Sequence, residues 1–164
     1  MNFEGVIVGI DPGSKCVGWS MVATYGQQLL NCGVVRGKTP TEVHEEGAGI
    51  SAFLRSRCGT IPVLVVIECP QVYPKRTHWK GPPNDLIRIA LVGGMVVGSM
   101  SFTEVEVIRP HDWKGSVPKE VMLGRIQKRL TSVEMQHVLN VDPPSLRHNA
   151  IDAVGIALWK AGRL

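Results

Sequence analysis

The sequence has 164 residues, of which 44% are hydrophobic and 20% are charged, and these proportions exclude a disordered chain. The length favours a single domain over residues 1–164, because two separate cores would need a longer chain. Lys and Arg number 18 against 14 Asp and Glu, and the resulting formal charge of +4 favours a polyanionic partner.

The first part of the chain predicts three antiparallel strands. Residues 5–10 are rich in β-branched side chains and end at Asp11-Pro12-Gly13, where proline and glycine turn the chain. Residues 17–23 and 29–36 fit two further strands, joined by a turn near Tyr25-Gly26. Asp11 is therefore expected at the end of the first strand of a meander.

A helix and a buried strand are predicted next. Residues 41–57 fit a helix, and residues 61–67 form an almost continuous apolar run, which is typical of a central strand covered on both faces. Because a strand–helix–strand crossover makes its strands parallel, the strands at 5–10 and 61–67 should end at the same edge of the sheet. Glu68 follows the second of them, so we expect it beside Asp11.

The second half of the chain predicts a loop, a helix, a fifth strand and two more helices. The ranges are 73–84 for the loop, 85–100 for the first helix, 103–108 for the strand, and 119–130 and 145–160 for the last helices. Met122, Ile126 and Leu130 share one face of the helix at 119–130. The predicted fold class is α/β, a five-stranded mixed sheet flanked by helices.

The helix at 85–100 has a small residue at every fourth position, namely Ala90, Gly94 and Gly98. This spacing lets another helix approach closely. Two explanations fit: the small residues pack into the protein's own core, or they form the seam of a homodimer.

Cysteine usage and hydropathy bear on the cellular compartment. The four cysteines include no C-x-x-C pair, so neither a zinc site nor a disulfide framework is predicted. No signal peptide opens the chain, and its most apolar run, 87–100, contains Arg88 and is shorter than the roughly 20 residues that span a bilayer. We expect a soluble, cytoplasmic protein without a membrane segment.

Three acidic residues stand where charge is not needed for solubility. Asp11 and Glu68 each end a buried strand, and Asp152 lies among Ile151, Val154 and Ile156 in the last helix. A buried carboxylate must be paired or bind a metal, and each of the three alone could be a cap or a salt bridge. Convergence at one sheet edge favours a Mg²⁺ site, with Mn²⁺ as a substitute, suited to hydrolysis of a phosphodiester.

His148 and Asn149 are the candidates for a fourth group. His148 is four residues before Asp152 and Asn149 is three before it, so both could project with that carboxylate from one helix. The spacing alone does not choose between them.

These motifs resemble those of the RuvC-type Holliday-junction resolvases, which belong to the ribonuclease-H-like superfamily, and the phage-type members are the most similar. The resemblance covers nearly the whole chain and rests on Gly9-Ile10-Asp11-Pro12-Gly13, Gly18-Trp19, Val66-Ile67-Glu68 and His148-Asn149-Ala150-Ile151-Asp152-Ala153. It implies a ribonuclease-H-like fold, metal-binding acids at Asp11, Glu68 and Asp152, and a homodimer. It also implies a fourth group just before the last aspartate; we favour His148 as this catalytic residue and metal ligand, because a neutral imidazole can bind a metal and move a proton, and Asn149 is the alternative. The implied activity is paired nicking, in strands of like polarity, of a four-way DNA junction, in a bacterial cell or a phage-infected host.

Two basic regions are predicted to bind the branched DNA. The segment 109–129 has six basic residues against two acidic ones, and the loop at 73–84 combines aromatic with basic side chains, which suits phosphate contacts and stacking on unpaired bases. Alternatively, that loop is solvated, with Trp79 folded onto the domain. The predicted DNA-binding residues are Tyr73, Lys75, Arg76, Trp79, Lys80, Lys114, Lys119, Arg125, Lys128 and Arg129.

Three other functions are open at this point. A nuclease of the same fold could act more broadly on flaps and forks. A catalytically silent DNA-binding module fits if Asn149 replaces an essential ligand. An actin-like ATPase also begins with a strand and an aspartate, but it needs two such domains around its nucleotide. We therefore expect no nucleotide cofactor.

Overall fold

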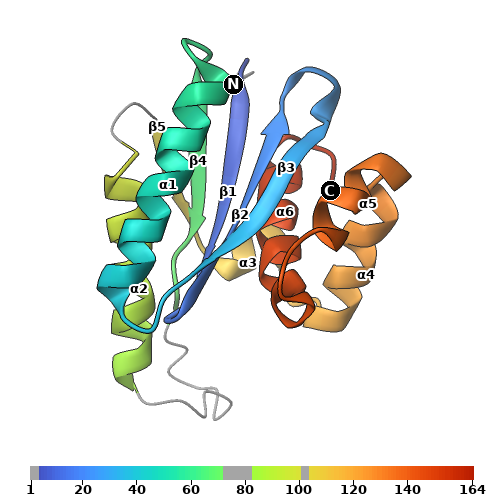
Figure 1. The fold of residues 1–164 in the computed structure, drawn as a ribbon. Coiled ribbons are helices and arrows are strands. Elements are labelled where there is room, and N and C mark those ends of the chain that lie inside the picture. Colours follow the sequence, from blue (N-terminus) through green and yellow to red (C-terminus); the bar gives the residue numbers. More distant parts are fainter. Residues whose placement is uncertain (1–3, 72–82, 101–103) are drawn as a thin grey trace.

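The structure is a computed structural model that describes residues 4–71, 83–100 and 104–164, and its centre is a five-stranded mixed sheet (Figure 1). The strands lie in the order β3-β2-β1-β4-β5. β1 pairs antiparallel with β2 and parallel with β4, as the crossover predicts. The bounds are Val6–Pro12 for β1, Cys16–Ala23 for β2, Leu29–Arg36 for β3, Val63–Glu68 for β4 and Glu104–Ile108 for β5.

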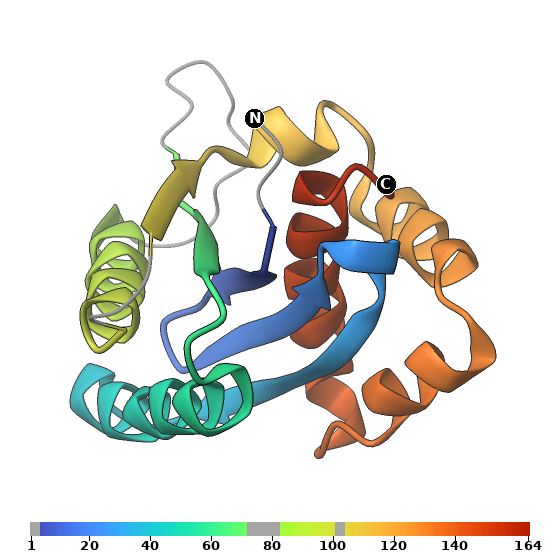
Figure 2. The same ribbon diagram turned by 90° about the horizontal axis from the view of Figure 1, so that it is seen from above.

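Helices cover both faces of the sheet, so the predicted α/β class is confirmed (Figure 2). Helices α1 (Pro40–Cys58) and α2 (Pro83–Gly98) lie on one face. Helix α6 (Arg147–Lys160) lies on the other face, with α4 (Lys119–Arg129) and α5 (Ser132–Leu139) outside it. Helix α3 (Pro110–Lys114) follows β5 directly.

The structure corrects the predicted elements in five places. Helices α3 and α5 have no predicted counterpart, and a short 3-10 helix, η1 (Tyr25–Gln27), forms the turn between β2 and β3. The last helix begins at Arg147, after a separate 3-10 turn, η2 (Pro144–Leu146), rather than at residue 145. Helix α2 begins at Pro83, so the last two residues of the predicted loop are helical, and the rest of that loop lies outside the described residues.

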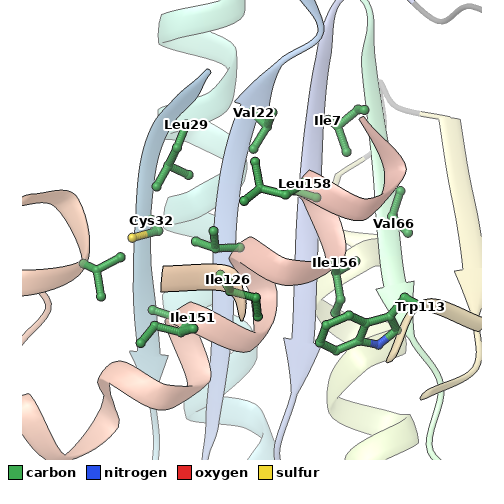
Figure 3. Close-up of a cluster of buried hydrophobic side chains, with 14 of the residues drawn as sticks. Ile7, Val22, Leu29, Cys32, Val66, Trp113, Ile126, Ile151, Ile156 and Leu158 are labelled. Atoms are coloured by element: carbon green, nitrogen blue, oxygen red, sulfur yellow. The ribbon is translucent and has the colours of Figure 1, made fainter. Parts of the chain in front are cut away.

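Alternation along β1 separates two cores. Val6, Val8 and Ile10 face α1 and α2, whereas Ile7 faces α6, because successive strand residues point to opposite faces. The core on the α6 side of the sheet is closed by Trp113 of α3 together with side chains of α4 and α6 (Figure 3). Both faces of the central strands are therefore buried, as the apolar run in β4 predicts.

Helix α6 lies directly on the sheet because glycines face it. A Cβ atom built on Gly9 would lie 2.2 Å from the Ala153 carbonyl oxygen, and one on Gly18 would lie 2.1 Å from that of Asn149. Ser20 Oγ also donates a 2.8 Å hydrogen bond to the Ala153 carbonyl. These contacts hold the N-terminal half of α6 directly against β1 and β2.

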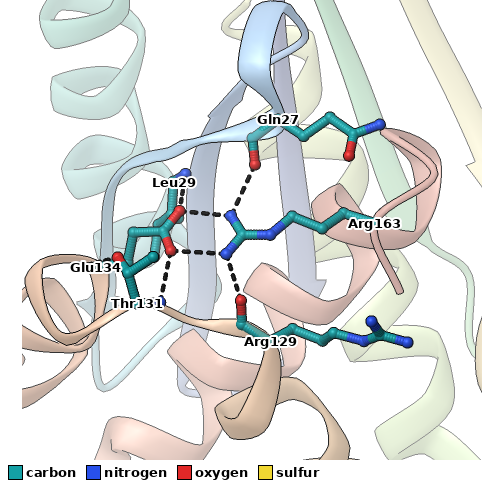
Figure 4. A network of polar contacts seen from close by, with 6 residues as sticks. All are labelled: Gln27, Leu29, Arg129, Thr131, Glu134 and Arg163. Atoms are coloured by element: carbon teal, nitrogen blue, oxygen red, sulfur yellow. Dashed lines mark hydrogen bonds and ion pairs between the residues drawn. The ribbon is translucent and has the colours of Figure 1, made fainter.

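An ion-pair network fastens the end of the chain to the sheet and to α4 and α5 (Figure 4). The Arg163 guanidinium contacts both oxygens of Glu134, at 2.5 and 2.7 Å, and also donates to the backbone oxygens of Gln27 and Arg129. The Glu134 carboxylate also accepts hydrogen bonds from the backbone N–H groups of Leu29 and Thr131. The pKa of Glu134 is lowered to about 2, chiefly by Arg163.

The small residues of α2 face away from the core. Ala90, Gly94 and Gly98 are exposed, whereas Val92 and Val96 on another side of the helix are buried. A Cβ atom added at Gly94 or Gly98 would have no neighbour within 4 Å. Packing of these residues into the protein's own core is therefore wrong, and the dimer seam stays a prediction.

No helix in the described ranges has the length and apolar character required to cross a bilayer.

Candidate active site

Three carboxylates converge at one edge of the sheet. Ile10 of β1 lies opposite Ile67 of β4 in the parallel register, so Asp11 and Glu68 are neighbouring positions where the two strands end. Asp152, in the second turn of α6, is only 9% exposed. Burial, followed by the negative charges of Asp152 and Glu68, raises the pKa of Asp11 to about 8, against the opposing effect of Lys114 and Lys119. The other two carboxylates therefore act electrostatically on Asp11.

Glu68 and Asp152 are both held by side chains from the segment after β5. Trp113 Nε1 donates a 2.5 Å hydrogen bond to Glu68 Oε2, and Lys114 Nζ lies 3.1 Å from the same oxygen. Lys119 Nζ lies 3.1 Å from Asp152 Oδ2. The Lys114 ammonium is also 4.9 Å from the centre of the Trp113 ring, within the range of a cation–π contact. Two ammonium groups thus balance much of the negative charge.

Trp113 is a site residue that the sequence analysis missed. Its ring is buried in the α6 core, with 6% exposure, while its indole N–H reaches the carboxylate (Figure 3). A buried indole requires a hydrogen-bond acceptor. Its place between charged residues, in Asp112-Trp113-Lys114, was the available signal, because an apolar ring in a basic segment indicates local burial.

The donor set fits a hard divalent cation. Asp11, Glu68 and Asp152 offer only carboxylate oxygens, the ligands that Mg²⁺ prefers. A cation would also favour the ionised form of Asp11, whose burial disfavours charge. As the side chains lie, no three His, Cys, Asp or Glu groups in the described ranges are arranged to hold an ion.

His148 and Asn149 lie differently at the start of α6. His148 is exposed, and its Nδ1 is 2.9 Å from the Ser145 carbonyl oxygen. Since a carbonyl only accepts, Nδ1 carries the proton there, which leaves Nε2 as an acceptor. Asn149 is partly buried against the sheet and donates a hydrogen bond of 3.3 Å to Cys16 Sγ. Neither has a described hydrogen bond to the three carboxylates.

The predicted DNA-binding residues fall into three groups. Arg125, Lys128 and Arg129 are exposed on α4 and line a groove with Trp113 and Lys114. Lys114 and Lys119 lie at the carboxylates, as described above. The remaining ones, Tyr73, Lys75, Arg76, Trp79 and Lys80, lie outside the described residues.

A mixed sheet of this order, with acids at the ends of β1 and β4 and a third acid on the last helix, defines a protein with the ribonuclease-H-like fold. Solved structures agree: the chain superposes on RuvC of Thermus thermophilus with a TM-score of 0.62, at 23% identity, covering 95% of this chain and 93% of that one. A second structure, of T. thermophilus RuvC in complex with a Holliday junction substrate, gives a TM-score of 0.60 at 18% identity, covering 96% and 93%.

Sequence relatives point to a particular group within this fold. The chain is 29% identical, over 142 residues, to the crossover junction endodeoxyribonuclease RuvC of Nitratidesulfovibrio vulgaris strain DP4, covering 84% of this chain and 79% of that protein. It is 26% identical to the RuvC of Prochlorococcus marinus strain MIT 9313, covering 93% and 95%. No family model matches the chain. The predicted resemblance to RuvC-type resolvases is confirmed.

Proposed function

We propose that this protein is a metal-dependent endodeoxyribonuclease that resolves Holliday junctions by paired nicks in strands of like polarity. The observation that carries the proposal is the convergence of Asp11, Glu68 and Asp152 at one sheet edge. The relatives named crossover junction endodeoxyribonuclease support the reaction and the class of substrate.

The carboxylates are proposed to hold Mg²⁺, or Mn²⁺ in its place. Such ions activate water and stabilise the leaving oxygen of a phosphodiester. Asp11 supplies the carboxylate whose ionised form most needs a cation, and Trp113 orients Glu68 through its indole N–H. His148 is proposed as the fourth group, because its Nε2 is available to accept a proton or to bind an ion at the exposed start of α6.

The substrate's backbone is proposed to lie along α4. Arg125, Lys128 and Arg129 line a groove that reaches Trp113 and Lys114, so a strand bound there would lead to Glu68. Phosphate neutralisation by such side chains gives a salt-dependent affinity that does not depend on base sequence. This property suits an enzyme that recognises the shape of a junction.

Two copies of the chain are proposed to pack through α2, because symmetric nicking needs two active sites. Besides the small residues, this helix exposes Ile87 and Leu91, at 67% and 53%. Strand β5 beside it exposes Val105 and Val107, and an apolar groove runs between the two elements. An interface there would bury apolar surface that otherwise faces water.

The test compares three labelled substrates: a four-way junction, a flap and a linear duplex, each with Mg²⁺ and with a chelator. We expect cleavage of the junction alone, only with Mg²⁺, at symmetric positions on two strands, and none by the Asp152→Asn variant. Equal cutting of all three DNAs would replace the resolvase with a broader branched-DNA nuclease. Binding of the junction without cutting in any metal would indicate a silent binding module.

A further inference from the structure

The turn between α3 and α4 carries both ammonium groups that reach the acidic cluster. Lys114 is the last residue of α3 and Lys119 is the first of α4, with Gly115-Ser116-Val117-Pro118 between them. They contact different acids: Lys114 lies at Glu68, from the adjacent strand, and Lys119 at Asp152, from α6. A single short turn therefore bridges the two sides of the cluster.

These two lysines differ in how firmly they are held. The Lys114 side chain is 31% exposed and is held by Glu68 and by the Trp113 ring. The Lys119 side chain is 54% exposed, and its described ion pair is with Asp152 alone. The Lys119 ammonium regains water when it leaves, so its departure should cost on the order of 1 kcal/mol once a cation takes its place. The side chains of the acids that the two lysines contact are only 14% and 12% exposed, so these carboxylates stay at the sheet edge.

On these contacts we propose that Lys114 and Lys119 compete with the divalent cation for the acidic cluster, and that the cation releases both ammonium groups to the DNA backbone. This inference rests on the metal site of the proposed function. A cation held by Glu68 and Asp152 would be repelled by the two ammonium groups that lie 3.1 Å from their oxygens, since like charges at short range repel even in water. The lysines must therefore move, and the groove along α4 is where phosphates would receive them.

The competition links metal binding to DNA binding. Without the cation, the two lysines are engaged in ion pairs with the cluster and are not available to phosphate. With the cation, the two ammonium groups become available to phosphates. By linkage, DNA must raise metal affinity by the same factor that metal raises DNA affinity. The competition thereby keeps the metal affinity of the DNA-free protein low, and binding of the junction raises that affinity.

The experiment measures Mn²⁺ binding to the DNA-free protein by titration calorimetry, for the intact chain and for Lys119→Met. We expect Mn²⁺ to bind the variant about fivefold more tightly, because one exposed ion pair no longer has to be broken. Lys128→Met is the matched control, since it removes the same charge from the outer face of α4. It should change Mn²⁺ affinity by less than about twofold, whereas Lys119→Arg, which keeps the charge, should stay near the intact chain.

A second measurement uses Ca²⁺, which supports binding of DNA without requiring cleavage, and compares junction affinity with and without the ion. The gain from the ion should shrink by at least about threefold in Lys114→Met, Lys119→Met double variants. Unchanged or weaker Mn²⁺ binding by Lys119→Met, with normal binding by the intact chain, would overturn the competition alone. Failure of the intact chain to bind Mn²⁺ at all would instead overturn the proposed metal site.

Discussion

Glu134 offers the sharpest test of how the fold holds the C-terminal segment. Its pKa is lowered from 4.5 to about 2, first by the Arg163 ion pair and then by backbone N–H donors from Thr131 and Leu29. Because the folded pKa lies below the unfolded one, the stabilisation is complete above about pH 5 and disappears as the pH falls through 2. The difference in pKa corresponds to about 3 kcal/mol. Glu134→Gln keeps the shape of the side chain and removes this contribution.

We expect Glu134→Gln to lower the free energy of unfolding at pH 7 by about 3 kcal/mol, and the midpoint of thermal unfolding by about 10 °C. Urea unfolding followed by circular dichroism at pH 7 and pH 3 measures both the loss and its pH dependence. The gap between the two proteins should narrow at pH 3, because Glu134 is then protonated in the unfolded chain, and this proton uptake favours unfolding of the intact protein. Glu120→Gln, an exposed acid on α4, is the control. A loss below about 1 kcal/mol at pH 7, or a gap that widens in acid, would refute the reasoning.

Three predictions concern activity and assembly. Asp11→Asn, Glu68→Gln and Asp152→Asn should each reduce junction cleavage at least roughly 100-fold. Junction affinity should rise in Glu68→Gln and Asp152→Asn, since removing a negative charge relieves repulsion of phosphate, and stay equal in Asp11→Asn, whose carboxyl already holds a proton at pH 7; cleavage and gel-shift assays measure the two effects. In single-turnover kinetics, His148→Ala should reduce the cleavage rate about 100-fold without a gain in junction affinity, and Asn149→Ala should change the rate only slightly. The reverse pattern would make Asn149 the fourth group. Gly94→Glu should give a monomer in sedimentation, because it places a charge in the proposed interface. Gly124→Glu is the control and should stay dimeric. Neither position has a neighbour within 4 Å in the protomer, so both variants should keep the fold.

The position of the carboxylates was predictable because it depends on the backbone alone. Apolar β-branched runs fix β1 and β4, a helix between them makes the two strands parallel, and each run ends at an acid. The third acid follows from periodicity, since Asp152 lies within a helix whose other residues from 150 to 158 are buried. None of these steps requires knowledge of side-chain contacts.

Helices α3 and α5 were not predicted from the sequence, for two different reasons. Helix α3 has only five residues, and a hydrophobic period cannot be recognised over little more than one turn. Helix α5 did carry a signal: Thr131 and Glu134 form a capping box, the pattern of a hydroxyl residue followed three positions later by an acid. The sequence analysis did not use it. The Glu134–Arg163 pair itself joins positions far apart in the chain, and local patterns contain no information on such contacts.

The pairing of lysines with the cluster was also beyond sequence reasoning. The basic charge of segment 109–129 was interpreted as a surface for phosphate, and this interpretation treats each lysine as exposed and directed to solvent. Where Lys114 and Lys119 point depends on Gly115, which has a φ of 58°, and on Pro118, which precedes α4. The turn between them directs both ammonium groups back to the sheet edge.

Asp11 places a measurable cost on the folded protein. Burial, Asp152 and Glu68 raise its pKa from 3.8 to about 8, so between pH 4 and pH 8 the folded state holds a proton that the unfolded state has lost. The free energy of unfolding must therefore fall as the pH rises through this window, and level off above pH 8.

In the presence of a chelator, Asp11→Asn should be more stable than the intact chain at pH 8 by a few kcal/mol, with a flatter pH profile. Thermal unfolding at pH 5 and pH 8 measures this, with the exposed acid Asp142→Asn as control. Added Mg²⁺ should restore part of the lost stability to the intact chain and none to Asp11→Asn, because a cation stabilises only the ionised carboxylate. If Asp11→Asn were instead the less stable protein at pH 8, the carboxylate would be making favourable contacts within the fold, and it would no longer be explained as a group kept for its chemistry.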